Sequence, residues 1–236
     1  MILRWLICFS LLAAGSARTA VVSGKVVVRD SRVDDVKRRK NYSGVVISLS
    51  PVGQPPDPTP GKHYRMLQKD KRFTPHVLPV VAGSTVDFPN DDPIFHSAFS
   101  SYNGQIFDVG LYPPGETRSV KFTRPGIIRV FCNIHPSMSA VILVLTTPYF
   151  ASTREDGFFH IDAPPGDYEL NVFHERATEA TLETLGKRIT VTDSGVEVPP
   201  IVISESGYVA GPHKNKYGKD YPPGSGDDAT YPGARK

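Results

Sequence analysis

Residues 126–145 read GIIRVFCNIHPSMSAVILVL, and this stretch predicts two strands joined by a short loop. In the first strand, alternation places Ile128, Val130 and Cys132 on one face, because successive side chains of a strand point to opposite sides. After the loop, residues 140–145 are continuously apolar, which is typical of a buried strand. We therefore expect two adjacent strands of a β-sandwich, with Cys132 pointing inward where the first strand ends.

The signals on both sides of this stretch are also those of short strands. The chain has 20 Gly and 22 Pro, spread in clusters typical of turns, which favours many short strands over long helices. Val86 and Phe88 alternate within a sandwich predicted for residues 63–146. Residues 147–205 predict a second, smaller β-domain, with a hairpin-type turn at Asp156. The expected fold class is all-β.

The two ends of the chain are predicted to lie outside this core. Arg4, an apolar run and three small residues make residues 1–17 a predicted secretory signal peptide, with a retained signal anchor as the alternative. Residues 18–62 predict a β-hairpin with a long charged loop, followed by a Pro-rich linker. Residues 206–236 contain almost no aliphatic side chain and predict a disordered tail.

These features predict an exported protein, periplasmic or secreted, with no integral membrane segment once the signal peptide is cleaved. The formal net charge of the chain is only +3. The one dense run of basic residues, at positions 37–40, contains no aromatic residue. We interpret this run as a solvated loop and expect no nucleic-acid partner.

Cysteine usage points to a specific role for one thiol. The chain has two cysteines, and Cys8 would leave with the signal peptide, so Cys132 would be the only thiol of the mature protein. An unpaired cysteine in an oxidising compartment can form an intermolecular bridge, act as a catalytic thiolate, remain buried and inert, or bind a metal.

The residues around Cys132 favour the metal. Cys132, His135 and Met138 follow the spacing C-x2-H-x2-M, and His96 lies upstream in the same predicted sandwich. A thiolate, two imidazoles and a weak axial thioether are the ligands of a blue-copper electron-transfer site. C-x2-H alone also occurs in zinc sites, and each residue alone is compatible with a core position. Their combination in one β-domain favours one mononuclear, type-1-like copper ion.

The same residues carry a family resemblance. The string VVAGSTVDFPND at residues 80–91, then His96, then residues 126–138, resembles the plastocyanin/azurin (cupredoxin) family, with a ligand loop similar to that of amicyanin. The similarity is greatest to exported plastocyanin-like proteins often labelled methylamine-utilisation proteins, in which a Thr-Pro-Tyr-Phe segment follows, here residues 147–150. The resemblance implies a Greek-key β-sandwich with His96, Cys132 and His135 as equatorial ligands and Met138 as the axial ligand.

One position departs from the family. Cupredoxins usually have Asn directly after the first histidine, where it braces the ligand loop near the sulfur, and this chain has Ser97. A serine can still donate one hydrogen bond, so we expect an altered bracing of the loop.

The smaller domain carries a second resemblance. Residues 149–175 resemble a carboxypeptidase regulatory-like, transthyretin-type module, which implies a non-catalytic β-sandwich. The predicted hairpin near the N-terminus resembles the opening of a similar module and could complete this sandwich.

The expected function is one-electron transfer between periplasmic redox partner proteins that dock transiently. The edge of His135 is expected near the surface as the electron port, inside an apolar collar. The collar would comprise Pro93, Ile94, Phe95 and Pro136. The alternative is non-redox copper binding, storage or delivery in the cell envelope.

We do not expect an enzyme. The further copper centres of an oxidase are usually built from His-x-His pairs, which this sequence does not contain. A cysteine hydrolase would need an oxyanion hole and an Asn or Asp partner, and no sequence signal identifies either.

Overall fold

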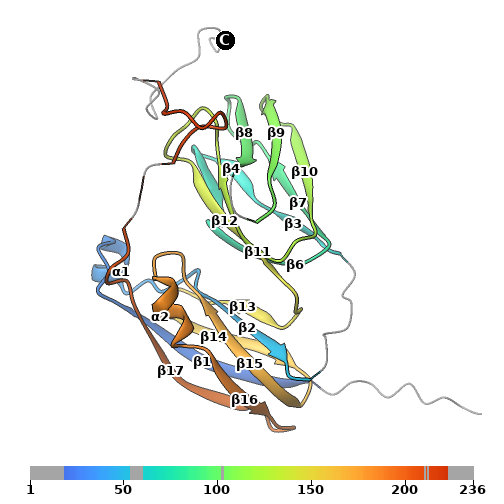
Figure 1. Ribbon diagram of the computed structural model, residues 1–236, viewed down its shortest axis with the longest axis vertical. Helices are drawn as coiled ribbons and strands as arrows, with labels where there is room; N and C mark the ends of the chain where they lie inside the picture. The colour runs from blue at the N-terminus through green and yellow to red at the C-terminus, as the bar shows by residue number, and fades with distance from the viewer. Residues whose placement is uncertain (1–18, 54–60, 102–103, 210, 212, 223–236) are drawn as a thin grey trace, which may run out of the picture.

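The chain forms two β-sandwiches, one above the other in Figure 1, and each encloses its own hydrophobic core. We call them the upper and the lower sandwich. The computed structural model describes residues 19–53, 61–101, 104–209, 211 and 213–222, so the predicted signal peptide lies outside the described residues. The prediction of an all-β protein is confirmed. Neither of the two short helices among the described residues has the length or apolarity to cross a bilayer.

The upper sandwich contains β3 to β12. Its sheets have the strand orders β10-β7-β3 and β6-β12-β11-β8-β9, and β4 and β5 form a separate two-stranded sheet. The strands are β3 His63–Arg65, β4 Leu67–Lys69, β5 Arg72–Thr74, β6 Val77–Val81, β7 Ser84–Pro89, β8 His96–Ser100, β9 Phe107–Tyr112, β10 Thr117–Phe122, β11 Gly126–Phe131 and β12 Ser139–Leu145.

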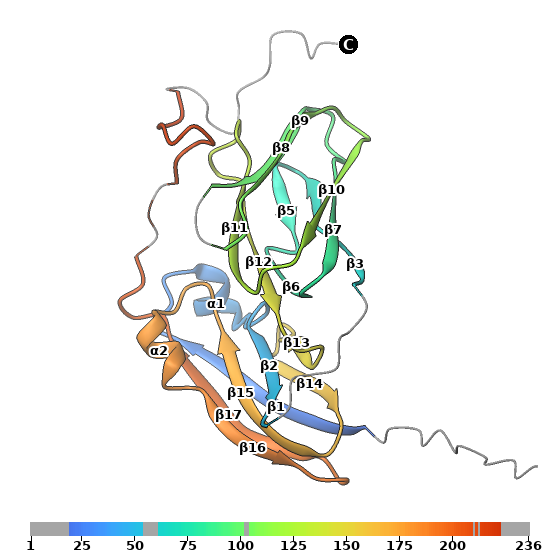
Figure 2. The ribbon, with the colours of Figure 1, turned by 45° about the vertical axis from the view of Figure 1, so that its right-hand side comes forward.

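The lower sandwich combines strands from both ends of the chain. Its sheets have the orders β14-β1-β17 and β13-β2-β15-β16. The elements are β1 Ala20–Arg29, α1 Asp34–Arg39, β2 Val46–Pro51, β13 Phe150–Ser152, β14 Phe158–Ala163, β15 Gly166–Phe173, α2 Glu179–Glu183, β16 Lys187–Val191 and β17 Val196–Ser204. The upper sandwich is therefore inserted between β2 and β13 of the lower one (Figure 2).

The hairpin predicted within residues 18–62 is wrong. β1 pairs with β14 and β17 in one sheet, whereas β2 pairs with β13 and β15 in the other. The charged residues between them form α1 rather than a loop, and the buried Val36 anchors this helix on the core. Since the connection crosses from one sheet to the other, β1 and β2 cannot pair. Instead, β1 and β2 each join one sheet of the sandwich formed by β13 to β17. The expectation that the N-terminal strands could complete this sandwich agrees with that arrangement.

The alternation read from the sequence agrees with the burial of the strands. Ile128, Val130 and Cys132 are all completely buried in the core of the upper sandwich. Arg129, on the opposite face of β11, is partly exposed and reaches the lower sandwich. β11 pairs with β12 over its whole length, so the segment between them is a tight connection between neighbouring strands.

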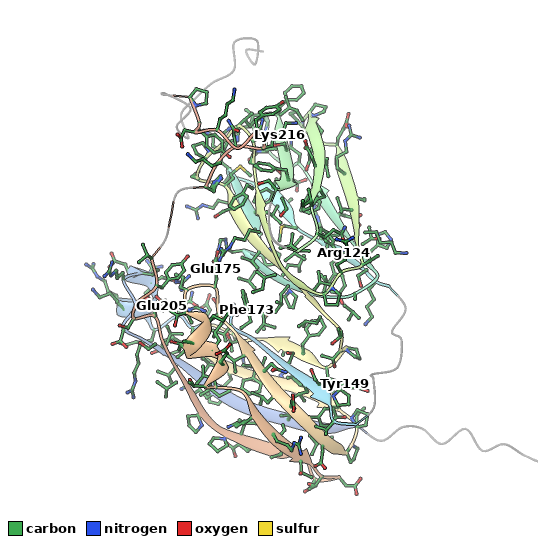
Figure 3. All side chains as sticks on the ribbon, viewed as in Figure 1. Arg124, Tyr149, Phe173, Glu175, Glu205 and Lys216 are labelled. Atoms are coloured by element: carbon green, nitrogen blue, oxygen red, sulfur yellow. The ribbon has the colours of Figure 1, made fainter. Side chains whose placement is uncertain are left out.

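An ion-pair cluster joins the two sandwiches. Glu175 follows β15 and lies between the sandwiches in Figure 3. One of its oxygens is 2.5 Å from Nε2 of His76, and the other accepts from Arg129 at 3.4 Å. The hydrogen bond to Glu175 raises the pKa of His76 above its ordinary value of 6.5. Burial alone raises the pKa of Glu175, but the bond to His76 and the charges of Arg129 and Arg176 outweigh burial and lower it.

This cluster should make the junction pH-dependent. Folded His76 holds its proton more tightly than the unfolded chain, so its stabilising contribution is complete below pH 6.5 and is lost as the pH rises through the raised pKa. The contribution of Glu175 is lost on the acid side, as the pH falls below 4.5 through its lowered pKa. Titration of the His76 ring protons by NMR should give a pKa above 6.5 that returns toward 6.5 in Glu175→Gln. Equal titration of His76 in both proteins would contradict this description of the junction.

Candidate metal centre

Three of the four predicted ligands lie in the loop of residues 132–138, which we call the 132–138 loop. The pairing of Phe131 with Ser139 closes β11 on β12 at the base of this loop. Within it, the Cys132 amide donates to the Met138 carbonyl at 3.2 Å, and the Met138 amide donates to the His135 carbonyl at 3.0 Å. These bonds hold the loop in a compact turn, with Cys132, His135 and Met138 all buried.

His96 reaches the loop from a neighbouring strand. β8 runs antiparallel to β11, with Phe99 opposite Phe131. Continuing this register places the start of β8 opposite the 132–138 loop, so His96 meets the loop although it lies 36 residues before Cys132 in sequence. The His96 side chain is completely buried.

The three strongest donors converge on one point. Sγ of Cys132 lies 3.9 Å from Nδ1 of His96 and 3.7 Å from Nδ1 of His135. All three donor atoms lie within 4.8 Å of one another. A first-row metal at about 2.3 Å from sulfur and about 2.0 Å from nitrogen, with 120° between its bonds, would separate sulfur from nitrogen by about 3.7 Å. The observed spacing therefore fits a trigonal ion at the centre of this cluster.

The environment of Cys132 favours its thiolate. Burial alone raises the pKa of this thiol, but hydrogen bonds from His135 and His96 and from the Ile134 amide outweigh burial and lower the pKa to about 5. The thiolate is the form of cysteine that binds metals. At neutral pH this site thus presents one anionic sulfur and two imidazoles.

Ser97 braces the loop in place of the asparagine of the resembling family. Its Oγ accepts the Asn133 amide at 2.8 Å and lies 3.7 Å from Sγ of Cys132. Because the amide occupies an acceptor position of Oγ, the hydroxyl proton remains available to the sulfur. The expectation that serine supplies one hydrogen bond to the site agrees with this geometry.

Asp92 orients His96, and this residue was not among the candidates predicted from the sequence. Oδ2 of Asp92 lies 2.7 Å from Nε2 of His96. The carboxylate also accepts the amides of Asp70 at 2.7 Å and Lys71 at 2.9 Å. When a metal replaces the proton on Nδ1, Asp92 would keep the Nε2 proton of His96 and so hold the tautomer in which Nδ1 binds the metal. An acidic residue four positions before His96 was the available sequence signal.

The position of His135 differs from the expected electron port. Its side chain is completely buried, and its Nε2 has no hydrogen-bond partner among the described residues. Of the expected apolar collar, Phe95 is 43% exposed, whereas Pro136 is half-buried. The prediction that the His135 edge lies near the surface is therefore wrong for this conformation of the chain.

A segment near the C-terminus lies against the 132–138 loop. Residues 213–222, which we call the C-terminal segment, fall within the predicted disordered tail but make specific contacts in the structure. Tyr221 donates its hydroxyl to the Cys132 carbonyl at 2.8 Å, and Nε2 of His213 lies 2.7 Å from the Pro136 carbonyl oxygen. The Lys216 amide donates to the side chain of Asn133 at 3.1 Å. The expectation of disorder is corrected for these residues, since their polar groups pair with the loop.

The fold and this centre together define an all-β protein with a buried His–Cys–His cluster suited to a transition metal. No family model matches the chain, and no curated protein matches it. Solved structures with partial similarity include a copper-containing nitrite reductase, a purple cupredoxin and an amicyanin.

The first of these is the copper-containing nitrite reductase of Thermus scotoductus SA-01, with 26% identity over 42% of this chain and a TM-score of 0.33. The match spans only 25% of the reductase chain. The second is a purple cupredoxin from Nitrosopumilus maritimus, with 20% identity, covering 34% of this chain and 98% of that one, at a TM-score of 0.32. The third is amicyanin from Paracoccus versutus, with 16% identity, covering 41% and 91%, at a TM-score of 0.33. At these TM-scores the similarities carry no argument of their own, so we base the proposed function on the donor geometry.

Proposed function

We propose that this chain binds one mononuclear, type-1-like copper ion and transfers single electrons between partner proteins. His96, Cys132 and His135 would be the equatorial ligands and Met138 the axial ligand. The observation that supports this most strongly is the spacing of Sγ from the two Nδ1 atoms, 3.9 and 3.7 Å, around a common centre.

The donor types favour copper over zinc. Structural zinc sites are mostly tetrahedral and built from Cys and His. Here a thiolate and two imidazoles have trigonal spacing. Met138, from the same loop as Cys132 and His135, is buried in the same core. Thiolate and thioether are soft ligands that favour Cu(I), while imidazole also suits Cu(II), so both redox states are accommodated. A bound copper ion would supply the one-electron couple.

The chain itself contributes rigidity and exclusion of water. The hydrogen bonds within the 132–138 loop, the Asp92 bond to His96 and the Ser97 bond to Asn133 hold the donors in place. A site held in this way changes little between oxidation states, which is the requirement for fast electron exchange.

A second candidate function is copper storage or delivery in the cell envelope. The complete burial of His135 favours it, because a closed site exchanges electrons poorly with large partners. A storage site would prefer Cu(I) and remain colourless, whereas a carrier would absorb strongly in the visible range when oxidised.

The remaining parts of the proposal concern location and partners. We propose export to the periplasm or medium, transient docking of redox proteins at the 132–138 loop end of the upper sandwich, and no catalytic activity. The lower sandwich would be a non-catalytic, carboxypeptidase regulatory-like module. Two observations support this assignment: the sequence resemblance of residues 149–175 and the two-sheet arrangement of β1, β2 and β13 to β17.

The test is a titration of the purified protein with Cu(II), followed by absorption spectroscopy and a potentiometric titration. We expect one copper per chain, an intense visible band from thiolate-to-copper charge transfer, and a reversible one-electron transition. One tightly bound Cu(I) without a reversible couple would favour storage instead. Absence of stoichiometric copper binding would contradict both.

Asp92→Asn tests the support of His96. Removing the carboxylate charge weakens the hydrogen bond that orients the His96 ring through its Nε2 proton. We therefore expect copper affinity to fall by about tenfold or more. Competition with a chelator of known affinity measures this. Asp91→Asn is the matched control, because the neighbouring Asp91 is exposed and pairs with Arg65 at 3.4 Å. An equal effect of the two substitutions would contradict a specific role for Asp92.

A further inference from the structure

The C-terminal segment covers the end of the upper sandwich at which the candidate ligands lie. It is drawn in dark red in Figure 1, beside the connection between β11 and β12, and Figure 2 shows the same arrangement from a second direction. The chain leaves the lower sandwich after β17 and then reaches the upper one. Figure 3 labels Lys216 at this end of the molecule.

The contacts fall on both sides of the candidate ligands. Tyr221 bonds the carbonyl of Cys132 itself, and His213 bonds the carbonyl directly after His135, that of Pro136. The His213 ring also stacks on Phe131, with 4.0 Å between ring centroids and 20° between planes. The segment therefore spans the 132–138 loop from its first residues to the position beyond His135.

The segment has structure of its own. Oδ1 of Asn215 accepts the amides of Tyr217 and Lys219 at 3.0 and 3.1 Å, and the Asn215 amide donates to the Lys219 carbonyl at 2.9 Å. This turn presents Lys216 to the upper sandwich, where Nζ lies 2.8 Å from Asp108 on β9. A loop closed by its own asparagine loses less conformational freedom when it docks.

We propose that the C-terminal segment is a strap that closes the copper site, occupying the face at which a redox partner would otherwise meet His135. We attribute the complete burial of His135 to this closure. Because the strap is held by a few hydrogen bonds, one ring stack and one ion pair, it can open without unfolding either sandwich. A partner would exchange electrons quickly only with the open form. The purpose of the strap rests on the proposed copper function, whereas the closure can be tested in metal-free protein.

The test uses alkylation of Cys132 by iodoacetamide in metal-free protein, quantified on the Cys132-containing peptide by mass spectrometry. A variant ending at Val209 lacks the strap and retains Glu205, which pairs with His174 and Arg176 in the lower sandwich. One hydrogen bond changes a population by roughly fivefold, so loss of the whole strap should raise the alkylation rate at least about tenfold. Near-UV circular dichroism verifies that the variant remains folded.

Two point variants keep the test independent of truncation. Lys216→Ala removes the contact with Asp108 and should accelerate alkylation in the same direction as truncation, by a smaller factor. Lys214→Ala is the matched control, because the one partner of Lys214 Nζ among the described residues is Asp220, at 2.5 Å within the same segment. Its rate should equal that of the parent chain. Equal rates in the parent, the truncated chain and Lys216→Ala would overturn the proposal, as would equal acceleration by the two lysine substitutions.

A second measurement connects closure to electron exchange. In the Cu(II)-loaded protein, reduction by hexaammineruthenium(II) should be faster in the truncated chain than in the full chain. If the chain did not bind copper, there would be no Cu(II) to reduce, but the difference in alkylation rate would remain. Failure of the proposed copper function can therefore be distinguished from failure of the proposed closure. An unchanged reduction rate together with faster alkylation would show that the strap excludes solutes without controlling electron exchange, and this would overturn the gating role.

Discussion

Cys132→Ser is expected to abolish the visible absorption of the Cu(II)-loaded protein and to remove stoichiometric copper binding. The sulfur is the shared neighbour of both imidazoles, and its low pKa of about 5 supplies the only negative charge among the four proposed ligands. A serine hydroxyl remains neutral at this position and is a much poorer ligand for copper. Absorption spectra and metal analysis of the parent and variant, loaded side by side, measure the effect.

His160→Ala is the control for nonspecific copper binding. His160 lies on β14 of the lower sandwich, exposed and outside the donor cluster. Its replacement should leave both the spectrum and the copper content unchanged. Retention of colour and of one copper per chain in Cys132→Ser would refute the proposed ligand set.

Met138→Leu is expected to keep one copper per chain and to raise the reduction potential. Leucine has a similar volume, so the buried position stays filled while the thioether donor is lost. Removing a weak axial donor disfavours Cu(II) more than Cu(I). A tenfold change in the ratio of the two affinities corresponds to about 59 mV for a one-electron couple, and we expect at least this shift. Protein film voltammetry or a potentiometric titration gives the value.

Met66→Leu provides the matched control. Met66 is the other methionine of the described residues and is completely buried in the same core. Its substitution makes the same chemical change without touching the 132–138 loop, so the potential should stay at the parent value. Similar shifts in both variants would indicate a general effect of repacking the core, and no shift in Met138→Leu would exclude the thioether as a ligand.

The local parts of this site were predictable from the sequence, and its tertiary parts were not. The spacing of Cys132, His135 and Met138 depends on one connection between neighbouring strands, so a local motif describes it. His96 was assigned to this site from the ligand set of a blue-copper centre and from the resembling family, because no local spacing links it to the loop and only the register of β8 against β11 brings it close. The contribution of Asp92 depends on the path of residues 70 and 71, which supply its other two hydrogen bonds.

Two of the corrected predictions, the N-terminal hairpin and the disordered tail, have a common physical cause, which is pairing between distant segments. β1 has the alternation of a hairpin strand, but its partners, β14 and β17, lie more than 120 residues away, and no local signal identifies them. The C-terminal segment contains no aliphatic side chain and cannot form a core of its own, which is why its sequence predicts disorder. Its order depends instead on polar contacts with the 132–138 loop, which becomes a docking surface only after the upper sandwich has formed.

X-ray absorption at the copper edge of the loaded full-length protein tests the proposed site most directly. We expect one short copper–sulfur distance, from Cys132, and two copper–nitrogen distances, from His96 and His135, with this sulfur signal lost in Cys132→Ser. A spectrum that contains only nitrogen and oxygen neighbours, or that is the same in the parent and Cys132→Ser, would show that copper does not bind at this cluster.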